Sequence, residues 1–412
     1  MSDLKRIYAS LDIGTNYIKA VVAEVYEGRM FVLASSMITS DGIVDGVIED
    51  EESVVVKVKE VINELSSMIG VEINKVVLGL PAYNVAITKL YGETYITNET
   101  GIIRGEDLQR AIVDATKKYN VEGNEIVNAI PLRYNIDGYV YDDAIGSEAN
   151  KLGVELLVLA TPANIIYPYL TVAEKSDLEV MDICLSPLAD KYEVLNDMDY
   201  DSAIIINIGF SQTSMLISNN NELKGIGTFG IGLKKIVESL VTKFEIHPVS
   251  ALEFINNYGI DHTINLSETI KLKSLENNEV EFVLEELVTY LEHVMISLLV
   301  SFKQEVEKYD LELYDKVVIT GGSVEITGFD VLCNRVFNNN SELYKPKYIG
   351  ARKSGYTTTF GLIRYIVDKN NIRGRYDSSL DQDLQMKIST PKKKIINLPE
   401  DSVLSKLIEY FF

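Results

Sequence analysis

One pattern occurs twice in this chain and constrains its fold more than any other feature. An apolar run leads into Asx-Ile-Gly and a β-rich run follows, at residues 8–25 (YASLDIGTNYIKAVVAEV) and again at residues 202–219 (SAIIINIGFSQTSMLISN). Apolar runs on both sides of a tight glycine turn are typical of a β-hairpin. The repetition predicts an α/β chain built from two lobes of similar construction.

A third glycine turn comes late in the chain. The segment VVITGGSVEITGFDVLCNRVF, residues 317–337, predicts an apolar strand, a turn at Gly321-Gly322 and then a helix. Before it, long amphipathic helices are expected at residues 227–244 and 281–309.

The stretch between the two hairpins has strand and helix signals of its own. A helix is expected over residues 105–119, where Leu108, Ile112 and Ala115 share one face. Extended apolar runs follow it. The size and pattern of residues 84–164 predict a small α/β subdomain inserted into the first lobe.

Composition and charge exclude several classes of protein. The net charge of −22 argues against binding to nucleic acid, because phosphate contacts require a basic face. No apolar run is long enough to span a bilayer, and the N-terminus lacks the pattern of a signal peptide, so we expect a cytoplasmic protein. Cys184 and Cys333 are expected to be buried free thiols. The three histidines have no metal-ligand spacing, which argues against a zinc or iron site.

The C-terminal tail differs from the acidic body. Residues 369–400 are polar and charged and predict a flexible linker, and residues 401–412 predict a short amphipathic helix. An apolar face with lysines nearby suits a helix that lies in the membrane interface. The alternative is a helix that docks on the protein's own core. The residues expected to contact a membrane are Lys392, Lys393, Lys394, Val403, Leu404, Lys406, Leu407, Ile408, Phe411 and Phe412.

Two glycine hairpins followed by strand–Gly-Gly–helix resemble the nucleotide-binding loops of the actin, Hsp70 and sugar-kinase superfamily. Within it, the chain resembles the FtsA family of bacterial cell-division proteins over essentially its whole length. The segments that carry the resemblance are LDIGTNYIKA, IPLRYNIDG, LSPLADKYEVLNDMDYDSA, TGGSVEITGF and YTTTFGLIRY, together with the basic-flanked apolar tail.

The resemblance implies a bilobed actin-like (RNase H-like) α/β fold with two duplicated lobes, an FtsA-type subdomain and a C-terminal amphipathic helix. The expected units are the first lobe (1–83 and 165–196), the inserted subdomain (84–164), the second lobe (197–368, with a smaller subdomain at 232–312), the linker (369–400) and the membrane helix (401–412).

The resemblance also implies an ATP site with Mg²⁺ between the lobes. Asp12 is the expected carboxylate that holds Mg²⁺ through water, and Lys19 is expected to face the β-phosphate. The residues expected at this nucleotide site are Asp12, Gly14, Thr15, Asn16, Lys19, Asn207, Gly209, Gln212, Thr213, Gly232, Gly321 and Gly322.

The second loop departs from the family pattern in ways that weaken such a site. Asn207 stands where the family usually has Asp, and Phe210 and Ser211 replace glycines. Ser186 stands where an acid often precedes Pro-Leu-Ala, and Leu252 and Ile255 replace the polar residues of an Ala-Glu-x-x-Lys pattern.

Each lost charge-assisted contact is worth roughly 1.5–3 kcal/mol. We therefore expect a weak or degenerate ATP site with little or no hydrolysis, and no enzyme. On the sequence alone, Asn207→Asp is expected to tighten binding of Mg-ATP.

By resemblance, the chain is a cell-division scaffold that polymerises like actin and anchors the FtsZ ring to the cytoplasmic membrane. Its implied partners are the C-terminal peptide of FtsZ, at about residues 232–312, further copies of itself, an anionic membrane surface and other division proteins. It is expected at the division site, on the cytoplasmic side of the membrane. The alternatives are a pilus-assembly scaffold of the same fold and an ATP-dependent sugar or acid kinase, which needs an intact magnesium site.

Overall fold

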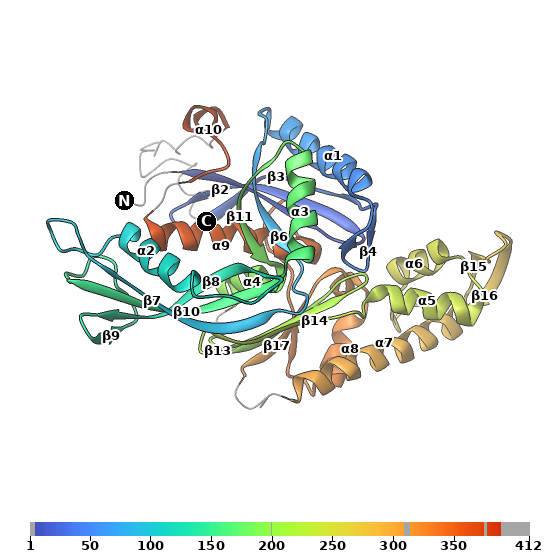
Figure 1. Cartoon of the computed structure of the whole chain (residues 1–412). Helices are drawn as coiled ribbons and strands as arrows, with labels where there is room; N and C mark the ends of the chain where they lie inside the picture. The colour runs from blue at the N-terminus through green and yellow to red at the C-terminus, as the bar shows by residue number, and fades with distance from the viewer. Residues whose placement is uncertain (1–4, 199, 309–313, 375–376, 389–412) are drawn as a thin grey trace, which may run out of the picture.

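The computed structural model describes residues 5–198, 200–308, 314–374 and 377–388 (Figure 1). Two five-stranded sheets have the same construction, with orders β3-β2-β1-β6-β11 and β14-β13-β12-β17-β18. In each, an antiparallel meander of three strands is joined through its first strand to two parallel strands. The predicted duplication and the two-lobed α/β fold are confirmed. The strands are β1 (Arg6–Ile13), β2 (Tyr17–Tyr26), β3 (Arg29–Thr39), β6 (Lys75–Leu80), β11 (Glu179–Leu185), β12 (Ala203–Ile208), β13 (Thr213–Asn219), β14 (Glu222–Phe229), β17 (Lys316–Thr320) and β18 (Ser341–Leu343).

The two predicted hairpins turn in the same way. In the first, the backbone N–H of Gly14 donates to the carbonyl oxygen of Tyr17 at 3.1 Å, and in the second Gly209 donates to Gln212 at 2.9 Å. A Cβ atom at Gly14 would lie 2.9 Å from the Tyr17 oxygen, and one at Gly209 would lie 2.8 Å from the Gln212 oxygen. The chain doubles back so closely at both turns that only glycine fits.

Two helices form the joint between the lobes. Helix α4 (Ser186–Asp197) packs along α9 (Thr357–Arg373), and α4 also contacts the second sheet while α9 contacts the first. A Cβ atom at Gly361 would overlap the carbonyl oxygen of Ala189, so the two backbones touch. The outer face of the first lobe is covered by α1 (Glu51–Ile69) and α3 (Ala163–Lys175).

The inserted subdomain is a four-stranded sheet, in the order β7-β10-β8-β9, with one helix on it. Helix α2 (Gly105–Thr116) is shorter than the helix predicted over 105–119, and it buries Leu108, Ile112 and Ala115 as expected. Gly92 lets α2 approach the sheet, because a Cβ atom there would overlap the Ala111 carbonyl. The strands are β7 (Ala86–Tyr95), β8 (Asn124–Ile136), β9 (Tyr139–Tyr141) and β10 (Lys151–Pro162).

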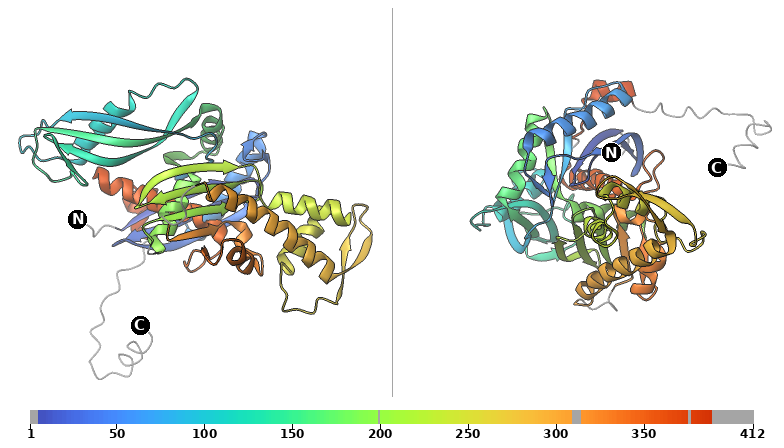
Figure 2. Two further views of the ribbon diagram at one scale, coloured as in Figure 1. Left: turned by 90° about the horizontal axis from the view of Figure 1, so that it is seen from below. Right: turned by 90° about the vertical axis from the view of Figure 1, so that its right-hand side faces the viewer.

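A second small subdomain lies at the opposite end of the molecule from the first (Figures 1 and 2). It contains the helices and hairpin strands between β14 and β17, and the turn and helix after β17 complete the second lobe. Its elements are α5 (Leu233–Phe244), α6 (Pro248–Asn257), β15 (Thr269–Lys273), β16 (Glu279–Val283) and α7 (Leu284–Val306), followed after β17 by the 3₁₀ turn η2 (Gly322–Glu325) and α8 (Phe329–Val336).

Two helix predictions were wrong at their N-terminal ends. The helix expected at 227–244 begins at Leu233, because the residues up to Phe229 pair with β13. The helix expected at 281–309 begins at Leu284, because the residues before it pair with β15 as strand β16. In both cases an apolar run that could continue a helix instead pairs with a neighbouring strand.

The predicted linker begins too early at residue 369. Helix α9 continues to Arg373, and Ser379 then fills a gap beside β1: its N–H donates to Ile7 O and its Oγ accepts from Ala9 N, both at 2.8 Å. Strand β6 pairs β1 only from Ser10 onward, so these backbone groups need another partner. Helix α10 (Gln382–Ile388) follows. The expected remainder of the linker and the membrane helix, residues 389–412, lie outside the described residues.

Both cysteines, Cys184 and Cys333, are buried and free, as expected. In the part of the chain that the structure describes, no helix is both long and apolar enough to cross a bilayer. The other boundaries of the units proposed from the sequence remain predictions.

The contact between α4 and α9 generates a stability prediction. Gly361→Ala should destabilise the chain by about 1–3 kcal/mol, because the added methyl group overlaps backbone rather than a movable side chain. Gly227→Ala is the control, since a Cβ atom at Gly227 meets nothing within 4 Å. Urea denaturation followed by circular dichroism measures both. Equal stability of the two variants would contradict the close helix contact.

Candidate functional site

The predicted site residues of the two hairpins meet at the junction of the lobes. Gly14, Thr15 and Asn16 form the first turn, and Gly209 and Gln212 belong to the second. The turns touch directly, because Ser211 Oγ donates to Thr15 Oγ1 at 2.9 Å. The space between the loops therefore holds the chain's own hydroxyl groups, one of them from a residue that replaces a family glycine.

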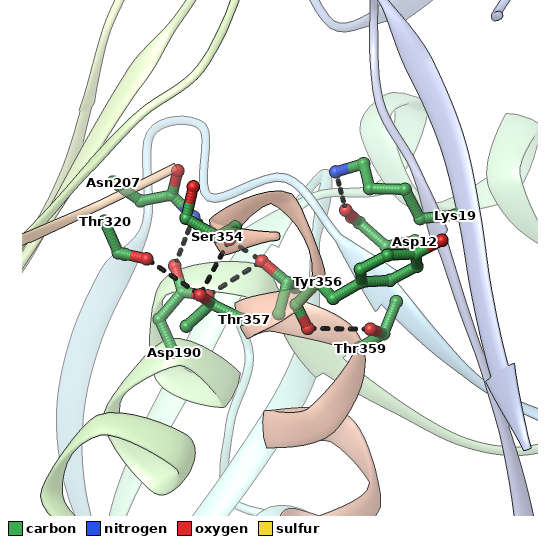
Figure 3. Close-up of polar contacts among 10 residues, drawn as sticks. Asp12, Lys19, Asp190, Asn207, Thr320, Ser354, Tyr356, Thr357 and Thr359 are labelled. Carbon is green, nitrogen blue, oxygen red and sulfur yellow. Dashed lines mark hydrogen bonds and ion pairs between the residues drawn. The ribbon is translucent and has the colours of Figure 1, made fainter. Parts of the chain in front are cut away.

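Asp12 and Lys19 form an ion pair on the first hairpin. They are opposite each other in the register of β1 and β2, and Lys19 Nζ lies 2.5 Å from Asp12 Oδ2 (Figure 3). Both side chains are largely buried. Asp12, which was expected to hold magnesium, is therefore paired here with Lys19, which was expected to face the β-phosphate.

A short hairpin of the first lobe, β4 (Ile43–Val44) and β5 (Val47–Ile48), bridges the two loops. Asp45 Oδ1 pairs with Lys234 Nζ of α5 at 3.0 Å, and the side chain of Gln212 donates to the Asp45 carbonyl. The N–H of Gly46 donates to Thr15 Oγ1 at 3.0 Å. We call the turn formed by Asp45 and Gly46, which makes these contacts with both loops and α5, the clasp.

Glycine is required in the clasp. Gly46 has a φ of +75°, and a Cβ atom there would overlap the Gln212 side chain. The clasp was not predicted. Its only signal in the sequence is the repeated Asp-Gly at residues 41–42 and 45–46, which marks turns without saying what they contact.

Asp190 is the most informative residue that the sequence analysis missed. It is fully buried on α4, where its Oδ2 accepts from Asn207 Nδ2 at 2.7 Å (Figure 3). Its Oδ1 accepts from Thr358 Oγ1, also at 2.7 Å. Burial raises its pKa to about 7, against the effect of those two hydrogen bonds. Asp190 follows Ser186 by four residues, so it lies one helical turn beyond the position where an acid was expected, but this spacing does not indicate the contact with Asn207.

The third glycine turn lies against the second loop. A Cβ atom at Gly321, where φ is +95°, would overlap Asn207 Oδ1, whereas one at Gly322 meets nothing within 4 Å. Ser354 Oγ donates to the Gly321 carbonyl at 2.7 Å and holds the turn in place. The open space at Gly322 is where the resemblance places the adenosine.

Two other predicted site residues, Gly232 and Thr213, lie against backbone oxygens of neighbouring segments. Gly232 precedes α5, where a Cβ atom would lie 2.5 Å from Phe210 O, and Thr213 Oγ1 donates to Ile231 O at 2.7 Å. On α6, Ile255 is buried in the core of the second lobe and Glu253 is exposed. Ile255 therefore offers a nucleotide no polar group where the family pattern has a lysine, as the sequence departure indicated.

The chemistry of these side chains fits a magnesium nucleotide. Lys19, Thr15 and Asn16 supply donors, the glycine turns allow close approach of backbone, and Gly322 borders open space. The fit requires the Thr15–Ser211 hydrogen bond to open, because both hydroxyls lie between the loops. Among the described residues no group of three or more His, Cys, Asp or Glu could hold a metal ion directly, so magnesium would be held mainly through phosphate oxygens and water.

The buried carboxylate of Asp190 predicts a pH dependence of stability. Its folded-state pKa, about 7, lies above the ordinary value. The folded chain therefore binds this proton more tightly than the unfolded chain between about pH 4 and pH 7. The free energy of unfolding that comes from this group falls as pH rises through that window, by up to about 1.4 kcal/mol per pH unit. Asp190→Asn should remove the slope, so the variant should gain stability relative to the natural chain as pH rises to 7.

Urea denaturation at pH 5, 6, 7 and 8 measures this difference. Glu72→Gln, which removes an exposed carboxylate, should run parallel to the natural chain. If Asp190→Asn also runs parallel, the carboxylate does not titrate in this window.

Comparison with known proteins agrees with the architecture. The family description "SHS2 domain inserted in FTSA" matches residues 84–160, within the inserted subdomain. Cell division protein FtsA of Enterococcus faecalis is 26% identical over 377 residues, which cover 89% of this chain and 84% of the relative. Cell division protein FtsA of Bacillus subtilis is 25% identical, over 90% of this chain and 85% of the relative.

Solved structures with the same fold are more distant in sequence. The PilM–PilN type IV pilus biogenesis complex matches with a TM-score of 0.60 at 14% identity, covering 86% of this chain and 97% of that chain. MreB5 of Spiroplasma citri bound to ADP matches with a TM-score of 0.52 at 15% identity, covering 89% and 98%. The resemblance indicated by the sequence is therefore confirmed: this chain is similar to cell division protein FtsA over most of its length and carries the FtsA-type SHS2 domain within an actin-like fold.

Proposed function

We propose that this chain is a cell-division scaffold of the FtsA type, which polymerises and anchors the FtsZ ring to the cytoplasmic membrane at the division site. The inserted subdomain carries this proposal. Residues 84–160 match an FtsA-type domain and form a sheet of their own between β6 and α3 of an actin-like body. Relatives that match over most of the chain are named cell division protein FtsA, which supports the division role.

The scaffold proposal includes a weak nucleotide site. The MreB5 structure of the same fold is bound to ADP, which supports nucleotide binding at the equivalent cleft. Three features argue for low affinity for Mg-ATP: Asn207 itself carries no charge, Ser211 places its hydroxyl between the loops, and α6 has apolar Leu252 and Ile255 where the family pattern has polar residues. We propose that ATP or ADP binds weakly with Mg²⁺ and that hydrolysis is slow or absent.

The membrane anchor belongs to residues 401–412. The body is strongly acidic, whereas residues 386–412 contain five lysines and three acids. A single short amphipathic helix binds a membrane reversibly, so firm attachment needs several anchors together. A homopolymer would supply several anchors. The acidic body would then face away from the anionic membrane surface.

The proposed partner site for the FtsZ C-terminal peptide is the small subdomain at residues 232–312. Two lysines of α7 and its end already have partners: Lys303 lies 3.8 Å from Glu307, and Lys308 lies 2.6 Å from Glu305. An acidic peptide would have to compete with these acids, so binding should be of modest affinity and sensitive to salt.

A kinase of the same superfamily is disfavoured by the cleft itself. Kinase chemistry needs a carboxylate base facing the acceptor. Asp12 is paired with Lys19, and both oxygens of Asp190 accept hydrogen bonds from Asn207 and Thr358. The pilus-assembly alternative shares the fold with PilM but is supported at only 14% identity.

The membrane anchor is tested by charge on either side of the tail helix. Leu407→Glu should reduce co-sedimentation with liposomes containing anionic lipid by about tenfold or more, because a charged group is costly in the apolar interface. Ser405→Glu adds the same charge on the polar face and should reduce binding much less. Equal sedimentation of Leu407→Glu and the natural chain would remove the tail as the anchor.

Partner binding should be independent of that anchor. A peptide copying the C-terminus of FtsZ from the same cell should bind the full chain and its Leu407→Glu variant with the same affinity, because the proposed surface belongs to the folded body. Fluorescence anisotropy of a labelled peptide measures this. Loss of binding in the tail variant would place the partner site on the tail.

A further inference from the structure

We infer that Asp190 supplies the negative charge that the second loop lacks, and that it acts through Asn207 on the magnesium of a bound nucleotide. In this role Asp190 is a positioning residue that touches neither nucleotide nor metal. The inference rests on the nucleotide binding proposed above and names the residue that replaces the missing loop carboxylate.

The hydrogen bonds give Asn207 one orientation. Its Nδ2 donates to Asp190 Oδ2 at 2.7 Å, and its Oδ1 lies on the side of Gly321, where a Cβ atom would overlap it. An amide can rotate to exchange its nitrogen and oxygen, but a carboxylate neighbour accepts only from the nitrogen. Asp190 therefore keeps the oxygen of Asn207 toward the third glycine turn.

Among the described residues no cation contacts the carboxylate of Asp190 directly, and the Lys19 ammonium, which acts on it through space and lowers its pKa, is already paired with Asp12. No lysine, arginine or histidine nitrogen lies within 4.0 Å of its carboxylate, and both of its hydrogen bonds come from neutral groups. A buried carboxylate without a cation is costly. If Asp190 served only to join α4 to α9 through Thr358, a neutral side chain would do so at lower cost.

A second buried carboxylate on the same helix provides the contrast. Glu193 lies on α4 three residues after Asp190, and it is fully buried as well. Its Oε2 pairs with Arg364 Nε at 2.6 Å, and its Oε1 accepts from Tyr344 OH at 2.7 Å. Glu193 therefore has a cation in direct contact, whereas Asp190, which contacts the cleft residue Asn207, does not. The divalent cation of a nucleotide would supply that positive charge.

This arrangement reverses one expectation from the sequence. Asn207→Asp alone would place two carboxylates at the 2.7 Å separation of the present hydrogen bond. Like charges at that distance repel, so one of the two would have to bind a proton. The single substitution should therefore not tighten binding of Mg-ATP. The exchange Asp190→Asn with Asn207→Asp keeps one carboxylate and one amide in contact.

Four full-length proteins test the inference: the natural chain, Asp190→Asn, Asn207→Asp and the double exchange. Titration calorimetry at pH 8 measures the affinity of each for ADP and ATP with magnesium, and again with EDTA in place of magnesium. The readout is the ratio of the two affinities, because a purely structural effect changes both in the same proportion. Glu193→Gln, at the paired carboxylate, is the matched control, and thermal unfolding verifies that each protein is folded. Asp190→Ser replaces Asp190→Asn if the latter does not fold.

The natural chain should bind nucleotide more tightly with magnesium than without. Asp190→Asn should lower that ratio by about 10- to 100-fold, the loss of one charge-assisted contact, with little change in EDTA. The double exchange should restore it, and Asn207→Asp alone should not raise it. Glu193→Gln should lower thermal stability and leave the ratio unchanged.

Two results would overturn the inference and can be told apart. If Asp190→Asn keeps the full magnesium ratio, the carboxylate is structural while the proposed nucleotide site stands. If the natural chain binds neither nucleotide in either condition, the nucleotide site itself is wrong, and a role for Asp190 in it fails as well.

Discussion

The direct contact between α4 and α9 is the constraint on which the rest of the structure depends. Gly361 brings the α9 backbone against the Ala189 carbonyl, and the buried pair of Glu193 and Arg364 fixes the two helices next to that contact. Since α4 leads from the first lobe into the second and α9 returns to the first sheet, this joint sets where the two hairpin turns stand. The cleft is therefore positioned by helix packing, and its loops can vary without loss of the fold.

The difference between local turns and contacts made between distant segments explains which parts of the fold were predictable from the sequence. The two hairpins are local, since Asp-Ile-Gly and Asn-Ile-Gly fix both turns. The strand order of each sheet was not predicted, because it depends on pairing with strands far along the chain, β6 with β11 and β17 with β18. The starts of α5 and α7 were not predictable, because the residues before them fit a helix locally and are taken into strands by β13 and β15. Ser379 beside β1 is likewise invisible in sequence, because its partners at Ile7 and Ala9 are some 370 residues away.

The residues of the candidate site likewise fall into those recognisable from a local pattern and those that depend on tertiary contacts. The turns, the site residues Asp12 and Lys19, and the departures at Asn207 and Ser211 could be found by pattern, although the ion pair between Asp12 and Lys19 was not predicted. Asp190 and the clasp could not, because each depends on an approach between separate elements: α4 against the end of β12, and the β4–β5 turn against Gln212 and Lys234. The sequence shows a lost charge at 207, and only the structure shows another carboxylate 2.7 Å from that side chain.

The clasp and a nucleotide compete for the same groups. Thr15 Oγ1 accepts from Gly46 N–H and from Ser211 Oγ, so a phosphate that uses this hydroxyl or the space beside it must first break those bonds. Each such bond contributes only about 0.5–1.5 kcal/mol, but together with the Asp45–Lys234 pair they hold the lobes together without a ligand. These contacts between the lobes come from the chain's own residues. Contacts of this kind suit the proposed scaffold, which has to present a partner surface, better than they suit an enzyme that must open and close in every cycle.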